Sequence, residues 1–309
     1  MPTPLASTLR LVKAAVPLIA SVVLSLSVAG VASGSEIIDR NAQNVRLSVD
    51  ASGRALISYR AHGRTMHVMA WGAIDARQPT SGRPQVSFRK DYSGRHWTSF
   101  QNQCRRYDGP ALSFAVATCA APDGSYWALQ SWRRTLPNFD GTPRNGLGAW
   151  ELHLSHWSGP IATLEAWTDW VYGGRYHHLF GRLTYGGKPV YGFTANRYGS
   201  PRDGYGRNIY VDTFNSRYGK GWRRENAFLA HRPTGVFCYG FYPFTSRGPG
   251  NGAKYRLTAI GPGVTPDVSI TIPGLHNYDA RNSADAAYER KQNALQDSIA
   301  SGDKKCRVH

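Results

Sequence analysis

The sequence predicts a mainly β protein that is built from two β-sandwich-like domains and ends in a short helix. Three observations favour this class: apolar and polar residues alternate in short runs, Gly and Pro are frequent (33 and 18 of 309 residues), and helical periodicity is confined to the C-terminal tail. Alternation with a period of two buries one face of a strand, and Gly and Pro mark the turns between strands. We expect the first domain at residues 35–178, the second at 179–273 and the tail at 274–309.

Residues 1–34 are expected to be a secretory signal peptide. Arg10 and Lys13 precede an apolar run from Ala14 to Val31 that ends among small residues, which is the order of a cleavable export signal. The alternative is an uncleaved anchor, because the run approaches the roughly 20 residues that span a bilayer. We expect cleavage, no transmembrane segment after it, and a mature chain that is secreted or associated with the cell surface.

Four cysteines lie in the expected mature part, and an even number in an exported chain predicts two disulfides. Four cysteines allow three pairings. We favour Cys104 with Cys119, which are close in sequence, and Cys238 with Cys306, which would tie the tail to the second domain. No Cys-x-x-Cys spacing occurs, so a zinc or redox site is not expected.

The chain is strongly basic, and this favours an anionic partner. Its formal charge of +17 falls to +15 once Arg10 and Lys13 are removed, and most of its cations are arginines. A guanidinium matches phosphate and carboxylate oxygens well. The alternative is a GC-rich genome, which raises arginine content without selection for binding. Nucleic acid is not expected as a partner, because no recognised binding module occurs and the compartment is wrong.

Three hairpins are predicted from alternating runs that flank turn residues. The turns contain Gly53, Pro122 with Gly124, and Gly159 with Pro160. The paired runs are Val45 to Val49 with Ala55 to Tyr59, Leu112 to Cys119 with Tyr126 to Trp132, and Trp150 to Trp157 with Ile161 to Trp170.

The third predicted hairpin would gather the best set of candidate catalytic groups on one polar face. Glycoside hydrolysis needs two carboxyl groups at a suitable separation. The alternative is a solvated sheet face with a cross-strand pair between His153 and Glu165. We assign no catalytic residue; a secreted glycoside- or peptidoglycan-directed hydrolase remains the second hypothesis. Its candidate residues are Glu151, Glu165, Asp169 and His153.

No metal or other cofactor is expected. His153 and His156 are three residues apart on a predicted strand, and His177 and His178 are adjacent, so the members of each pair face opposite sides. No nucleophile-elbow, zinc-protease, P-loop or dinucleotide motif occurs.

The second region contains a skeleton of glycines and prolines in a fixed order. It comprises Gly181-x-Leu183-x-x-Gly186-Gly187-Lys188-Pro189-Val190-x-Gly192, then Asp203-x-x-Gly206-Arg207-x-Ile209, then Pro233-x-Gly235-x-Phe237. This order resembles the transthyretin-like, carboxypeptidase-regulatory type of β-sandwich, which is also Ig-like in its layers. The resemblance covers about a third of the chain. Domains of this type are mostly non-catalytic modules. The resemblance therefore implies a β-sandwich architecture, and it identifies no ligand. The sequence departs from it at Phe193 and in the long stretch from Arg197 to Trp222.

Exposed aromatic rings beside arginines are expected to form a binding surface for sugars and their anionic groups. The chain has 9 Trp and 17 Tyr; the alternative is that most of the tryptophans lie in cores. We therefore expect a secreted, non-catalytic β protein that binds an anionic polysaccharide or another cell-envelope polymer. The candidate ligand-binding residues are Trp157, Trp167, Tyr205, Arg207, Tyr218, Trp222 and Arg223.

The tail is expected to form a helix capped by Ser283, with Asp285 in its first turn. A broken apolar stripe would pack on the second domain. The stripe consists of Ala284, Ala287, Tyr288, Leu295 and Ile299.

Overall fold

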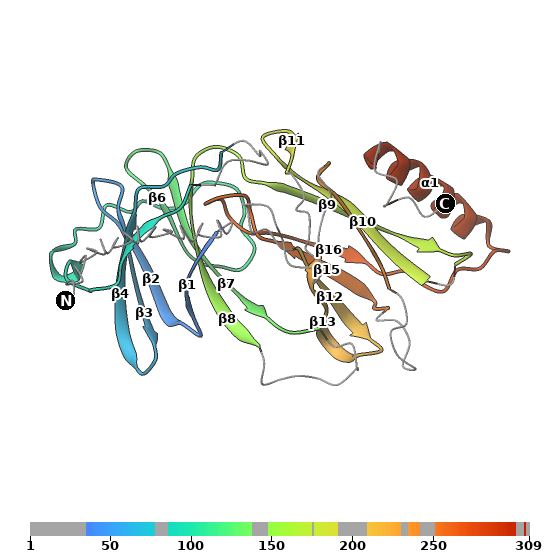
Figure 1. Ribbon diagram of the computed structural model, residues 1–309, viewed down its shortest axis with the longest axis horizontal. Helices are drawn as coiled ribbons and strands as arrows, with labels where there is room; N and C mark the ends of the chain where they lie inside the picture. Colours follow the sequence, from blue (N-terminus) through green and yellow to red (C-terminus); the bar gives the residue numbers. More distant parts are fainter. Residues whose placement is uncertain are drawn as a thin grey trace, which may run out of the picture. The chain divides into compact units, whose positions relative to one another are not determined.

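The polypeptide folds mainly into β-sheet, as the sequence predicts. In the part that the structure describes, a computed structural model shows four antiparallel sheets of four strands each and one long C-terminal helix (Figure 1). The structure describes residues 35–77, 86–137, 148–174, 176–190, 209–229, 234–241, 251–300 and 306.

The N-terminal half supplies two of the sheets. One has the strand order β1-β8-β7-β6 and the other has the order β2-β3-β4-β5. Their strands are β1 (Glu36–Arg40), β2 (Gln43–Val49), β3 (Ala55–Ala61), β4 (Arg64–Trp71), β5 (Arg89–Asp91), β6 (Ala115–Ala120), β7 (Tyr126–Arg134) and β8 (Ala149–Trp157), with a short 3-10 turn η1 (Trp97–Ser99) after β5.

The other two sheets follow in the sequence. One places β10 between β11 and β14, with β9 also paired to β10, and the other has the order β13-β12-β15-β16. Their strands are β9 (Thr163–Val171), β10 (Tyr176–Tyr185), β11 (Lys188–Pro189), β12 (Ile209–Ser216), β13 (Gly219–Leu229), β14 (Val236–Gly240), β15 (Lys254–Ala259) and β16 (Val268–Pro273), and helix α1 (Ser283–Ile299) follows them.

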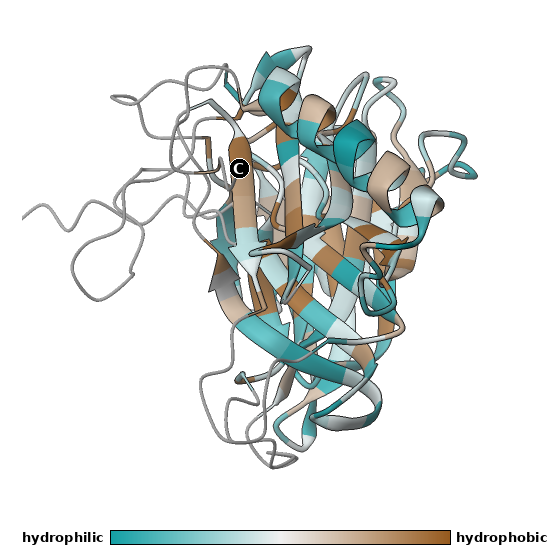
Figure 2. Cartoon of the chain, turned by 90° about the vertical axis from the view of Figure 1, so that its right-hand side faces the viewer, coloured by the Kyte–Doolittle hydropathy of each residue, from teal (hydrophilic) through white to brown (hydrophobic). Residues whose placement is uncertain are grey.

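Two large hydrophobic clusters lie between these strands. The first includes Ile57 of β3 and Trp127 of β7, so it draws on both N-terminal sheets. The second includes Leu179 of β10 and Leu257 of β15, so it draws on both C-terminal sheets. In Figure 2, hydrophobic and hydrophilic residues alternate along several strands, which is the pattern of strands with one buried face.

Two of the three predicted hairpins are confirmed. Strands β2 and β3 pair with Leu47 opposite Ile57, across the turn that contains Gly53. Strands β6 and β7 pair with Thr118 opposite Ala128, across the turn that contains Gly124. Both glycines have a positive φ, which a glycine adopts without steric cost.

The third predicted hairpin is wrong. Strand β8 pairs with β1 and β7, whereas β9 pairs with β10. The turn around Gly159 therefore carries the chain from one sheet to another. Almost all of β8 is buried on both faces, so its alternation identified a strand but could not identify its neighbour. The domain boundary expected at residues 178 and 179 lies inside β10.

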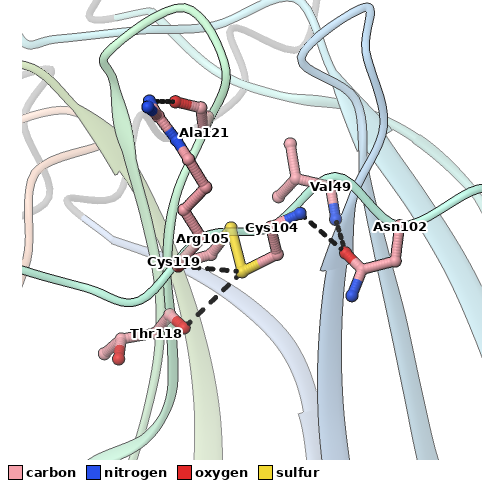
Figure 3. The surroundings of a disulfide bond; sticks show 7 residues. All are labelled: Val49, Asn102, Cys104, Arg105, Thr118, Cys119 and Ala121. Atoms are coloured by element: carbon pink, nitrogen blue, oxygen red, sulfur yellow. Dashed lines mark hydrogen bonds between the residues drawn. A yellow bond between two sulfur atoms is a disulfide. The ribbon is translucent and has the colours of Figure 1, made fainter.

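Both favoured disulfides are present, Cys104–Cys119 and Cys238–Cys306. Beside the first one, the side-chain oxygen of Asn102 accepts hydrogen bonds from the backbone N–H groups of Val49 (3.1 Å) and Cys104 (3.0 Å) (Figure 3). Asn102 and Cys104 lie in the irregular segment between η1 and β6. The hydrogen bond to Val49 attaches this segment to β2, and the disulfide attaches it to β6.

The C-terminal helix forms as expected, but a different residue caps it. Asn282 accepts a hydrogen bond from the N–H of Ala284 (3.0 Å) and is the N-cap, one residue before the expected Ser283. The fully buried helical residues are Asp285, Gln292 and Gln296; of the expected stripe, Tyr288, Leu295 and Ile299 are half-buried, and Ala284 and Ala287 are exposed. Asp285 accepts from His276 and from the N–H of Asp279, which offsets the cost of burying its carboxylate.

Removing each disulfide by paired alanine substitution should destabilise the protein, and the loss should be larger for the disulfide that closes the longer loop. The Cys238–Cys306 bond spans 68 residues and the Cys104–Cys119 bond spans 15. The chain-entropy model gives losses of roughly 4 and roughly 3 kcal/mol in the free energy of unfolding. Urea denaturation of the two double variants measures both; a larger loss for the shorter loop would contradict this order.

Candidate functional site

A fully enclosed polar cluster centres on His153 in β8. Its Nδ1 atom lies 2.8 Å from the hydroxyl of Ser35 and 3.1 Å from Oδ2 of Asp267, and its Nε2 atom lies 3.3 Å from Oε2 of Glu151. The Ser35 hydroxyl also donates to Asp267. All four side chains are buried. The cluster therefore joins the residue before β1, strand β8 and the residue before β16.

The neighbouring carboxylates keep this histidine charged. Burial disfavours the imidazolium, but the charge and hydrogen bond of Asp267, together with Glu151, raise the pKa of His153 to about 9. Burial likewise disfavours the Glu151 carboxylate, but the hydrogen bond from His153 and the charge of Arg134 lower its pKa to about 2. Near neutral pH, His153 is therefore an imidazolium between two carboxylates.

Asp267 also connects the cluster to strand β7. The indole N–H of Trp132 donates to its Oδ2 atom at 2.8 Å. The side-chain amide of Gln130 donates to the backbone carbonyl of Asp267 at 2.8 Å and accepts from its N–H at 2.9 Å. These contacts join residues that are 135 and 137 positions apart in the sequence, so the cluster cross-links distant parts of the chain.

This chemistry suits a structural role better than hydrolysis. A general base must be unprotonated and must lie within hydrogen-bonding distance of the group that it deprotonates. His153 holds its proton up to about pH 9 and has no exposed surface. Its two carboxylate partners are engaged in neutralising that charge.

The other two candidate carboxylates lie on strand β9 and have separate partners. Glu165 forms an ion pair with Arg182, and Oδ1 of Asp169 lies 2.7 Å from Nδ1 of His178. In both pairs the partner lies directly opposite on β10. Glu151 lies on β8, in another sheet. The four candidate catalytic residues are therefore not gathered on one face as the predicted hairpin required.

A different surface combines cations with aromatic rings. On one face of the β13-β12-β15-β16 sheet, Asp212 of β12 lies opposite both Arg224 of β13 and Arg256 of β15. Two residues along the same strand, Phe214 lies opposite Trp222 and Lys254. We call this surface the cationic face; it consists of Tyr210, Asp212, Phe214, Trp222, Arg224, Lys254 and Arg256.

Asp212 organises the arginines of the cationic face. Its carboxylate accepts from Nε of Arg224 at 2.5 Å and from Nη2 of Arg256 at 3.1 Å. The guanidinium carbon of Arg256 lies 4.5 Å from the ring centre of Trp222, and that of Arg224 lies 4.7 Å from the ring centre of Tyr210. Such stacking stabilises a cation and fixes its position.

The cationic face keeps a positive charge where it meets solvent. Its three cations exceed its single carboxylate, Asp212, by two charges. Arg224 and Asp212 are buried, Arg256 and Trp222 are half-buried, and Lys254 is exposed. The ammonium of Lys254 lies 5.3 Å from the ring centre of Phe214. The exposed end of this face therefore presents cationic donors beside aromatic rings.

Among the candidate ligand-binding residues, Trp222 belongs to the cationic face. Trp157 and Tyr218 are buried. Trp167 is half-buried with its ring centre 5.7 Å from that of Phe180, and Arg223 is half-buried. Tyr205 and Arg207 lie outside the described residues.

Lys254 and Arg256 were not among the predicted ligand-binding residues. A signal for them exists, because Lys254, Arg256 and Thr258 alternate with Tyr255, Leu257 and Ala259. This alternation marks a strand with a polar face.

Within the described ranges, no group of three or more His, Cys, Asp or Glu side chains has the arrangement of a metal site. No helix in those ranges is long and apolar enough to span a membrane.

Comparison with protein-family models, curated proteins and solved structures found no match for this chain. The geometry of the described surfaces is therefore the basis for the function proposed below.

Replacing His153 with Gln should lower the free energy of unfolding by about 3 to 5 kcal/mol at pH 6, because Asp267 would stay buried without a cation and Glu151 would keep only Arg40 and Arg134. The pKa of His153 is raised from 6.5 in the unfolded chain to about 9 in the native state. Protonated His153 therefore contributes its full stabilisation below pH 6.5, and this contribution is lost as the pH rises through about 9. The gap between the wild type and the variant should therefore narrow from pH 6.5 to 9. Urea denaturation across that range measures it.

His62→Gln serves as the matched control, since His62 is 63% exposed and pairs only with Asp39 among the ion pairs of the described residues. This control should remain close to the wild type at every pH. A constant gap between the wild type and His153→Gln would show that the charge of His153 does not contribute.

Proposed function

We propose that this protein is an exported, non-catalytic β protein that binds an anionic glycan or another anionic polymer of the cell envelope through the cationic face. The observation that carries this proposal is the stacking of Arg256 on Trp222 beside exposed Lys254. A guanidinium and an ammonium bind carboxylate, sulfate or phosphate groups. The aromatic rings beside them provide an apolar surface for a sugar ring.

The geometry of the cationic face favours a repeating anionic ligand. Its cations lie on β13 (Arg224) and β15 (Lys254 and Arg256), which flank β12, so these two strands are about 10 Å apart. Asp212 holds Arg224 and Arg256 in place, so less side-chain entropy is lost when a ligand binds. A polymer that carries one anionic group per repeat can contact Lys254 and Arg256, the two cations of this face that are not buried, at the same time.

Export is supported by the covalent structure. Two disulfides link all four cysteines, and stable disulfides are typical of compartments outside the cytosol. The expected signal peptide at residues 1–34 agrees with this assignment.

We also propose that the second region is a transthyretin-like β-sandwich within a protein of two β-sandwich-like domains. Its hydrophobic cluster is shared by strands of two sheets. Two glycines of the resembling skeleton have close neighbours: a Cβ at Gly181 would overlap the carbonyl of Glu165, and one at Gly235 would lie 2.8 Å from the carbonyl oxygen of Leu183. Both positions thus favour glycine on steric grounds, as a fixed structural skeleton requires.

Binding to polygalacturonate and dextran sulfate, with neutral dextran as the reference, tests the proposed function. The double variant Lys254→Ala/Arg256→Gln should bind both anionic polymers about tenfold or more weakly, since each charge-assisted hydrogen bond contributes roughly 1.5 to 3 kcal/mol. Wild-type binding should weaken as salt is raised, because exposed charges are screened within about 8 Å at physiological ionic strength. Biolayer interferometry at two salt concentrations measures both effects.

The charge-matched control is Arg290→Gln/Lys291→Ala, which removes two exposed cations from helix α1. This control should keep most of the wild-type affinity. Equal loss in both double variants would show that net charge alone drives binding, and binding that ignores salt would contradict the proposed contacts.

A further inference from the structure

A cavity of about 460 Å³ lies beside the turn between β2 and β3, apart from the cationic face. Its volume is within the range of small-ligand sites. One side is apolar: Trp71 ends β4, and Ile74 follows it with 44% of its surface exposed. The cavity is lined by Ser52, Gly53, Arg54, Trp71, Gly72, Ala73, Ile74, Asp123 and His156.

The Asp123 carboxylate also lines the cavity and is held by Ser125. Its Oδ1 atom accepts hydrogen bonds from the N–H and the hydroxyl of Ser125, at 2.9 and 2.6 Å. Burial opposes its charge, but these bonds lower the pKa of Asp123, so it is ionised near neutral pH. Its Oδ2 atom lies over Gly53, where a Cβ would approach it to 3.3 Å. One carboxylate oxygen is thus held in place while the other faces the region left open by Gly53.

The other ionisable groups of this cavity, Arg54 and His156, add little net charge. Arg54 donates from Nε to Asp50 at 2.7 Å, so its charge is largely neutralised. His156 donates from Nδ1 to the carbonyl of Ala73, and its Nε2 atom lies 2.8 Å from the Ser125 hydroxyl. Burial lowers the pKa of His156 to about 4, so it is neutral. The Asp123 carboxylate is therefore the dominant charge of the cavity wall.

We propose that this cavity binds a single pyranose unit that carries hydrogen-bond donors and no carboxylate. Hydroxyl groups on the sugar would donate to Oδ2 of Asp123, and the apolar face of the ring would lie against Trp71 and Ile74. A uronate would be repelled by Asp123. A second hollow of about 260 Å³ shares Ser52 and Arg54 with this cavity, which leaves space for an adjoining unit.

This cavity favours an uncharged sugar, whereas the cationic face favours anions. The two surfaces have no residue in common. The pyranose site does not depend on the proposed polymer binding, and each can fail without the other.

Saturation-transfer NMR tests the proposal with glucose, galactose and mannose, each compared with its own uronate at equal ionic strength. At least one neutral hexose should bind, and its uronate should bind about tenfold more weakly or not at all, because repulsion by the carboxylate costs more than about 1.4 kcal/mol. Absence of binding by all three hexoses, or equal binding of a hexose and its uronate, would overturn the proposal.

Asp123→Asn is the decisive variant. An asparagine keeps an oxygen to accept from Ser125 but replaces the second carboxylate oxygen with an N–H₂ donor. Hexose affinity should fall about tenfold and the discrimination against the uronate should disappear. Asp279→Asn, at an exposed carboxylate outside the cavity wall, is the matched control and should change neither. An unchanged hexose affinity in Asp123→Asn, with the same thermal midpoint as the wild type, would reject the site.

Discussion

The charged imidazole of His153 between Glu151 and Asp267 is the interaction on which the arrangement of the sheets depends. Burying three ionised groups carries a large desolvation cost, which is offset only when the charges pair and their remaining donors and acceptors are satisfied. Here the pairing requires strand β8 and the residue before β16 to be in place together. Trp132 and Gln130 then fix Asp267 to β7. Misplacement of any of these elements would leave a buried charge unpaired, so the cluster selects one arrangement more than it adds net stability.

The pairing of buried charges also distinguishes the candidate catalytic carboxylates from the cationic face. The carboxylates considered for hydrolysis are each paired with a basic side chain of the same chain: Glu151 with His153, Glu165 with Arg182 and Asp169 with His178. Their charges are compensated within the fold, and two of the three carboxylates are buried. The cationic face differs because Asp212 compensates only part of the charge of its neighbours. A surface with residual charge on rigid strands is suited to binding, since its geometry is set before the ligand arrives.

The sequence predicted local structure better than long-range pairing. The two confirmed hairpins have turns with Gly53 and Gly124, whose chemistry is local, and the helix has a local cap. Strand β8 was identified as a strand, but its partners β1 and β7 were not, because a period of two reveals a face and not a neighbour. The same limit applies to the candidate site. Alternation placed Glu151 beside His153, yet their third partner, Asp267, lies 114 residues beyond His153 and carries no local signal. Trp157 was expected at a surface and is buried, since tryptophan is compatible with either setting.

The net positive charge of the chain is a weaker guide to binding than the placement of individual charges. Arg54, Arg182 and Arg224 each bind a carboxylate of the same chain, so part of the arginine content maintains the fold. Composition alone cannot separate these residues from Lys254, which is exposed and lies beside the ring of Phe214. Asp123 is the opposite case, because the N–H and hydroxyl of Ser125 hold its carboxylate and no arginine of the described residues forms an ion pair with it. The positive charge of the whole chain attracts anions. A fixed carboxylate that faces a cavity instead favours uncharged ligands with hydrogen-bond donors, so recognition at that position follows local geometry and not net charge.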